Sequence, residues 1–297
     1  MSLWIVLAVL SQLLNAGIVL VDKYVLARGS KIGEPVAYAF YVSILSGVVL
    51  VMVPFGVVGI PSAWLLFMSF VGSISFVIAI LHLYRALKSG HASDAVPVSG
   101  ASSALATAFL ASVFLAEDLP RAFIPAFFLM VIGTFMIGRF RLSWKALGSI
   151  VFAGIFFGVS AISIKLVFME GTFFDAFFWS RMTNVVVALM LLLVPENRRL
   201  IFHGYRGASG GMKSLIVMNK AIGGVASYLF LIAISLGSVS MVQAMSGLQF
   251  AFLLVFAYIG SFWFPVFKHE IHPEQFKHQI FGVICIGAGL AALFLVH

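Results

Sequence analysis

The sequence has very few charged residues and only one cysteine. Of its 297 residues, 9% are Asp, Glu, Lys or Arg, whereas 62% are hydrophobic. Because soluble domains carry about 25% charged residues, this composition excludes an ordinary soluble protein and indicates a membrane protein that crosses the bilayer many times. Cys285 has no second cysteine to pair with, which excludes an internal disulfide and a cysteine-based metal site.

Motifs for catalysis or metal binding are also lacking. Nothing in the sequence places a serine nucleophile within reach of a histidine base. The histidines and acids between His269 and His278 have a spacing that matches no firm metal-ligand motif. We therefore expect no enzymatic activity, no metal and no cofactor.

Basic residues outnumber acidic ones, with 18 Lys and Arg against 10 Asp and Glu. In a soluble protein this excess raises the question of nucleic-acid binding. In a membrane protein it is typical of loops on the cytoplasmic side, so we expect no nucleic-acid partner. The expected partners are the lipid bilayer and a small-molecule substrate, with a homodimer left open.

Apolar blocks of spanning length predict an all-α membrane protein with ten transmembrane helices. The first block starts without a preceding basic residue and exceeds a signal-peptide core, so we expect it to be a retained helix. The predicted helices are Leu3–Ala27, Pro35–Val57, Ser62–Leu87, Asp94–Ala116, Pro120–Gly138, Trp144–Met169, Asp175–Val194, Ser214–Leu236, Ser238–Ser261 and Phe276–Val296.

The order of helices suggests a duplication of five helices. A shift of 142 residues places Lys23 on Lys165, and a shift of 147 places Ser99 on Ser246. An odd number of helices in each copy forces the second copy to cross the membrane in the opposite direction. The sequence therefore predicts two inverted five-helix repeats with a substrate site near the midplane between them. The predicted repeats are residues 1–142 and 143–297.

Basic residues lie almost entirely in the odd-numbered connections. Thirteen occur there, whereas the even-numbered connections hold Arg121 alone. By the positive-inside rule the odd connections are cytoplasmic, which places both termini outside.

Several local features resemble the ten-helix, EamA-like branch of the drug/metabolite transporter superfamily. The fourth helix opens with Pro97 and small residues and ends in the sequence 115–117, Leu-Ala-Glu. The last helix carries Gly282, Gly287 and Gly289 and follows the acidic Glu270. The resemblance implies a multi-pass transporter of the cell (inner) membrane.

That resemblance implies export of small organic metabolites, such as amino acids, by alternating access through a cavity between the halves. It also implies cytoplasmic termini, which conflicts with the basic-residue count, so the topology stays open. The alternatives to a transporter are a passive channel and a non-transporting membrane assembly or sensor protein.

Four cationic side chains lie inside predicted helices: Lys23, Lys165, Arg181 and Lys220. Inserting each of them at the membrane centre costs roughly 2.5–3.5 kcal/mol. Each cation either extends to water at the membrane interface or lines a cavity. The small residues on the same helix faces either line that cavity or allow close helix packing. Hydrogen-bonding side chains nearby act as interhelical ties or as ligand contacts. The candidate substrate-binding residues are Asn15, Lys23, Lys165, Arg181, Asn184, Lys220, Tyr228, Gln243 and Ser246.

The sign of the charge inside the helices discriminates between substrates. Asp22 is the one acid within a predicted helix, and its neighbour Lys23 is its expected partner. A proton-coupled exporter of hydrophobic cations needs a carboxylate deep in the bundle. The positive balance here instead favours a solute with a carboxylate or a phosphate, or a zwitterion.

Overall fold

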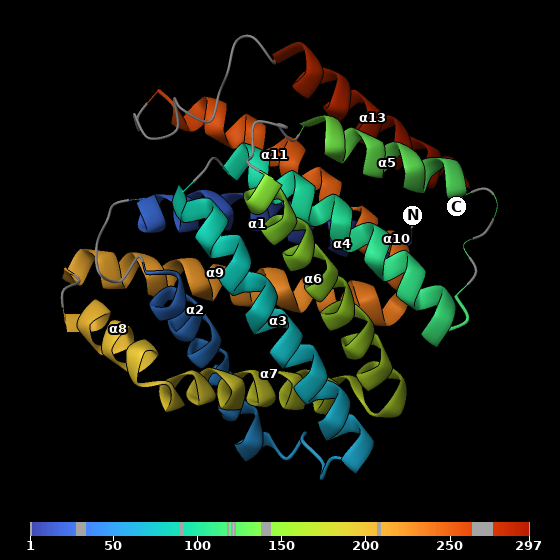
Figure 1. Ribbon diagram of the computed structural model, residues 1–297. Coiled ribbons are helices and arrows are strands. Elements are labelled where there is room, and N and C mark those ends of the chain that lie inside the picture. Colours follow the sequence, from blue (N-terminus) through green and yellow to red (C-terminus); the bar gives the residue numbers. More distant parts are fainter. Residues whose placement is uncertain are drawn as a thin grey trace.

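The computed structural model describes residues 2–27, 34–89, 92–117, 119, 121, 123–137, 144–206, 209–262 and 276–296 (Figure 1). Every element in these ranges is a helix. The first half contains α1 (Leu3–Ala27), α2 (Pro35–Ile44) with its 3-10 extension η2 (Leu45–Phe55), α3 (Ala63–Ser89), α4 (Ala92–Phe114) and α5 (Ile124–Ile137). The second half contains α6 (Trp144–Glu170), α7 (Phe173–Met190) with η3 (Leu191–Leu193), α8 (Pro195–Arg206), α9 (Gly210–Leu236), α10 (Val239–Ala244), α11 (Ser246–Gly260) and α13 (Phe276–Val296).

Among the described residues, eight segments are long and apolar enough to cross a membrane, by length and composition. They lie in α1, α2 with η2, α3, α4, α6, α7 with η3, α9, and α10 with α11. Two shorter apolar stretches, Ile124–Met136 and Lys277–Ala292, lie within α5 and α13. The all-α membrane fold is therefore confirmed, whereas ten crossings stay a prediction.

Local sequence signals place the helix ends. Pro35 occupies the first turn of α2, where its missing N–H is no loss, and Gly56 in a left-handed conformation ends η2. The hydroxyls of Ser209 and Ser238 accept hydrogen bonds from backbone N–H groups of the first turns of α9 and α10. These caps satisfy backbone groups that the helices leave unpaired.

Three differences from the sequence prediction stand out. α8 forms within the basic connection after α7, where no helix was predicted, because at 12 residues it is too short and too polar for a spanning block. The predicted helix Ser238–Ser261 is divided at Met245 into α10 and α11. α5 is also shorter than predicted.

Small residues allow the central helices to approach closely. α6 packs along both α3 and α4, while α1 packs along α9 and α5 lies against α13 (Figure 1). At Gly154 of α6, an added Cβ would lie 2.5 Å from the Ser99 carbonyl oxygen of α4. At Gly158 it would lie 2.8 Å from the Ala106 Cβ. Gly154 and Gly158 of α6 therefore serve helix packing rather than cavity lining.

We predict that Gly154→Val destabilises the protein because its branched side chain forces α6 away from α4. Overpacking of this kind costs about 1–3 kcal/mol, or roughly 5 °C in the melting midpoint. Gly148→Val on the same helix is the matched control, since nothing lies within 4 Å of its Cβ position. Size-exclusion chromatography of detergent-purified protein after heating measures both, and equal midpoints would contradict the assigned packing.

Candidate functional site

A cavity of about 390 Å³ lies between helices of both halves of the chain. Its wall is mainly apolar and includes Phe76, Phe157 and Phe250. The polar part of the wall comes from α1, η2, α3, α4, α7, α9, α10 and α11. The polar lining residues are Gln12, Asn15, Asp22, Ser46, Tyr84, Ser99, Ser103, Arg181, Asn184, Lys220, Ser227, Gln243, Ser246 and Gln249.

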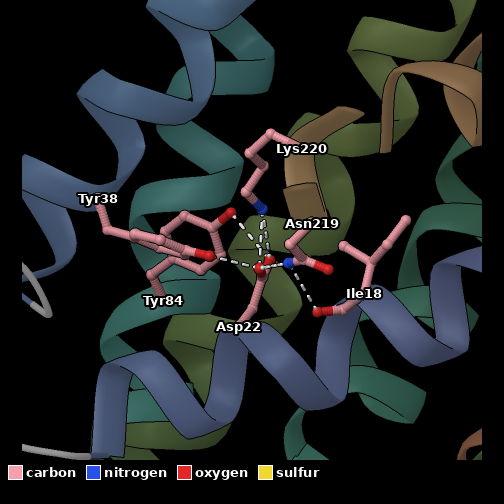
Figure 2. A network of polar contacts seen from close by, with 6 residues as sticks. All are labelled: Ile18, Asp22, Tyr38, Tyr84, Asn219 and Lys220. Carbon is pink, nitrogen blue, oxygen red and sulfur yellow. Dashed lines mark hydrogen bonds and ion pairs between the residues drawn. The ribbon is translucent and has the colours of Figure 1, made fainter. Parts of the chain in front are cut away.

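Asp22 on α1 is the centre of a buried polar network at this wall (Figure 2). Its carboxylate accepts both contacts of the Lys220 ammonium, at 2.7 and 3.0 Å. The hydroxyls of Tyr38 and Tyr84 donate to it at 2.5 and 3.2 Å, and the Asn219 amide donates at 2.7 Å. Four helices, α1, α2, α3 and α9, thus meet on one carboxylate.

The partner of Asp22 is Lys220, not the neighbouring Lys23 that the sequence suggested. Consecutive residues on a helix point about 100° apart, so Asp22 and Lys23 do not face each other. The Lys23 ammonium donates instead to the Leu87 carbonyl oxygen in the last turn of α3, at 2.7 Å. Lys220 is therefore neutralised by Asp22, and its ammonium also lies 5.0 Å from the Tyr38 ring centroid.

Arg181 on α7 leaves the cavity wall with an excess of positive charge. Its Nη2 donates to the Ser227 hydroxyl of α9 at 3.0 Å, and its guanidinium lies 5.7 Å from the Phe177 ring centroid. In the part of the chain that the structure describes, no carboxylate lies within 4.0 Å of it. Its buried Nε donor also has no hydrogen-bond partner there. Since Asp22 and Lys220 cancel, Arg181 sets the net charge of the lining at +1.

Two buried amides add unused hydrogen-bonding capacity beside Arg181. Asn184 donates to Ser46 at 3.3 Å and Gln243 donates to Ser103 at 2.5 Å, so one end of each amide is an interhelical tie. The carbonyl oxygens of both amides are buried and have no partner among the described residues. Asn184, Gln243 and Arg181 also line a smaller adjoining cavity of about 160 Å³. This region therefore holds one cation and two buried acceptors that have no partner among the described residues.

The backbone on the α9 side of the cavity is accessible. At Gly224 nothing described lies within 4 Å of an added Cβ, and at Gly223 the nearest atom is the Ile18 Cδ1 at 3.8 Å. The break between α10 and α11 falls beside Gln243 and Ser246, both of which line the cavity. Interrupted helices are typical of binding sites at the midplane of transporters.

The structure brings six of the nine sequence-predicted residues to the cavity and leaves three elsewhere. The three are Lys23, Lys165 and Tyr228. Lys165 donates to the Ile234 and Gly237 carbonyl oxygens at the end of α9, at 2.7 and 3.0 Å. Tyr228 packs edge-on against the Phe173 and Phe177 rings. Those at the cavity are Asn15, Arg181, Asn184, Lys220, Gln243 and Ser246.

Sequence reasoning missed two groups of site residues. It did not name Asp22 as a site residue, although an acid inside a membrane helix is by itself a signal. It also passed over Ser46 and Gln249, whose polar side chains lie at the cavity wall. The histidines and acids at positions 269, 270, 272 and 274 lie outside the described residues.

Comparison with known proteins gives a family for the first half and a fold for the whole chain. Residues 2–139 match the model of the EamA-like transporter family. A solved crystal structure with 14% sequence identity superposes with a TM-score of 0.67 and covers 97% of this chain and 99% of its own. No curated protein matches the sequence. The family match confirms the resemblance drawn from the sequence. The structural likeness shows that nearly the whole chain shares the fold of the solved structure.

We predict that a cysteine in place of Ser227 reacts with small charged thiol reagents, whereas one in place of Ala226 does not. Ser227 lines the cavity, and Ala226, its neighbour on α9, is fully buried. Both variants use a Cys285→Ser background. The nearby guanidinium attracts anions, so Arg181→Met should lower the rate for an anionic methanethiosulfonate relative to a cationic one by about fivefold. An unchanged rate ratio would contradict the positive potential assigned to the cavity.

Proposed function

We propose that this EamA-family membrane protein, placed in that family by residues 2–139, is a secondary transporter of a small organic solute that carries a carboxylate. We propose further that it works as an exporter of the cell (inner) membrane by alternating access. The observation that carries the proposal is the cavity between the two halves, whose wall holds the uncompensated Arg181.

The wall of the cavity suits an organic anion or zwitterion. A guanidinium binds a carboxylate through two parallel hydrogen bonds, and Arg181 lines the cavity with a buried Nε donor that has no partner among the described residues. The unpaired acceptors of Asn184 and Gln243 suit a donor group on the same solute. Aromatic walls cover its apolar part, and the volume is in the range of small-molecule sites.

Two lysine contacts support the inverted repeats. Lys23 donates to the Leu87 carbonyl oxygen at the end of α3, and Lys165 donates to the Ile234 carbonyl oxygen at the end of α9. The shift of 142 residues relates the lysines, and the shift of 147 relates the carbonyls. In each half, a cation near the end of the first helix satisfies an unpaired carbonyl at the end of the third. Ten crossings would place the two contacts on opposite sides of the membrane.

The halves differ at one pair of contacts, which supports alternating access. α7 packs along α3, where the hydroxyl oxygens of Ser73 and Thr183 lie 2.8 Å apart. Exchange of the halves converts this contact into one between η2 and α9, which do not pack along each other among the described residues. The cavity lies along this loose seam, lined by Ser46 and Val49 on one side and Gly224 on the other. Closing η2 on α9 while α7 leaves α3 would produce the opposite-facing state.

We predict that Arg181→Met abolishes transport by purified protein in liposomes. The assay uses labelled amino acids, monocarboxylates and dicarboxylates, and the quaternary cation tetraphenylphosphonium as a counter-example. Loss of a buried charge partner costs about 2–5 kcal/mol, so the flux of the transported anion should fall at least about 30-fold. Arg181→Lys should retain part of the flux, because the charge remains.

Arg121→Met is the matched control, since Arg121 is exposed and does not line the cavity. Tetraphenylphosphonium uptake that is unchanged by Arg181→Met would overturn the substrate class. Flux that rises linearly with solute concentration, without saturation or exchange, would favour the passive channel.

We predict that single cysteines at positions 62 and 209 are labelled from opposite sides of the membrane. Both serines are exposed, and Cys285→Ser removes the background thiol. The basic-residue count places Ser209 in the cytoplasm and Ser62 outside. Labelling of Ser209→Cys only from outside would overturn this orientation in favour of the family expectation of cytoplasmic termini.

A further inference from the structure

We propose that Asp22 and the groups around it form a cation site that Lys220 fills as a tethered cation. The site takes a small hard cation or a proton when Lys220 is absent. Resting on the proposed transport function, the inference adds that transport requires no sodium ion or proton at this position.

The Asp22 carboxylate, held from the other side by two phenols, forms a site suited to a cation (Figure 2). Both Asp22 carboxylate oxygens contact the ammonium, at 2.7 and 3.0 Å. The phenol oxygens of Tyr38 and Tyr84 bond the same carboxylate from α2 and α3. Carboxylates and neutral oxygens are the ligands that hard cations prefer. The chain therefore assembles an oxygen-rich site and places its own nitrogen cation in it.

Burial makes an occupant necessary. The side chains of Asp22 and Lys220 are 7% and 9% exposed, and both lie within membrane-spanning helices. A carboxylate in such a place needs a positive charge or a proton, because an uncompensated charge away from water is very costly. The groups that face Asp22 from the helices packed around it are Tyr38, Tyr84, Asn219 and Lys220. Among these, Lys220 supplies the positive charge.

The tether also determines which helices move together. Asp22 belongs to the first half and Lys220 to the second, so their separation would leave two uncompensated charges in the membrane. α1 and α9 also pack along each other, and Ser11 of α1 donates to the Ala226 carbonyl oxygen of α9 at 2.9 Å. The two helices therefore act as one unit, and Tyr38 joins the start of α2 to the same network. The relative motion falls instead on the seam between η2 and α9.

Removal of the Lys220 ammonium tests whether a sodium ion or a proton takes its place beside Asp22. Thermal unfolding of detergent-purified protein is measured in sodium chloride and in choline chloride, at pH values from 5.5 to 8.5. Wild-type protein should show the same midpoint in both salts. Lys220→Met should lose on the order of 10 °C in choline at high pH, because Asp22 is left uncompensated. Sodium ions or low pH should restore much of this loss.

Two further variants keep the test decisive. Asp22→Asn combined with Lys220→Met removes both charges and should be insensitive to sodium and to pH. Lys220→Gln retains a hydrogen-bond donor without the charge, and it replaces Lys220→Met if that variant is not recovered folded. It should show the same dependence on sodium or pH.

Lys88→Met is the matched control, since Lys88 forms a 2.8 Å ion pair with Glu34 at the surface. Water solvates Glu34 when Lys88 is removed, so no cation dependence should appear. The proposal is overturned if Lys220→Met responds to sodium and pH in the same way as Lys88→Met, or if wild-type protein gains stability from sodium that Asp22→Asn abolishes. The measurement uses no transported solute, so its failure is distinct from failure of the transport function.

Discussion

The pairing of charged groups inside the membrane is the constraint on which the rest of the structure depends. Asp22 is held by donors from three other helices, and Lys220 supplies the compensating charge across the two halves. This neutral network leaves Arg181 as the uncompensated charge of the cavity wall, among the residues the structure describes. The need for charge compensation that holds α1 against α9 therefore also leaves Arg181 as the charge that a solute meets.

Much of the fold follows from the sequence because membrane helices must be long, apolar and internally hydrogen-bonded. The apolar blocks predict most helix bounds closely, and small residues at positions such as Gly154 and Gly158 indicate where helices touch. The break at Met245 was not predicted, because no proline marks it and the polar Gln243 and Ser246 beside it also occur in unbroken membrane helices. α8 escaped prediction because it has no spanning length.

The site was predictable in its residue types but not in its pairings. Polar side chains inside apolar helices indicate Arg181, Asn184 and Gln243 as site residues, because an unpaired polar group is costly in the membrane interior. Sequence proximity wrongly suggested Lys23 for Asp22, whereas the partner lies 198 residues away. Nor did the sequence reveal that Lys165 donates to the carbonyl oxygens at the end of α9, since that depends on where α9 ends.

In the proposed transport cycle, α1 and α9 form a fixed pair, and the motion falls between η2 and α9. Electron paramagnetic resonance distances between spin labels test this claim most directly, with labels at the exposed Val48 and Val217 for the seam and at Leu10 and Val217 for the fixed pair. We expect two populations across the seam, with a ratio that shifts when the transported carboxylate is added, and a single population for the fixed pair. One unchanging distance across the seam, or a split distance between α1 and α9, would contradict the account.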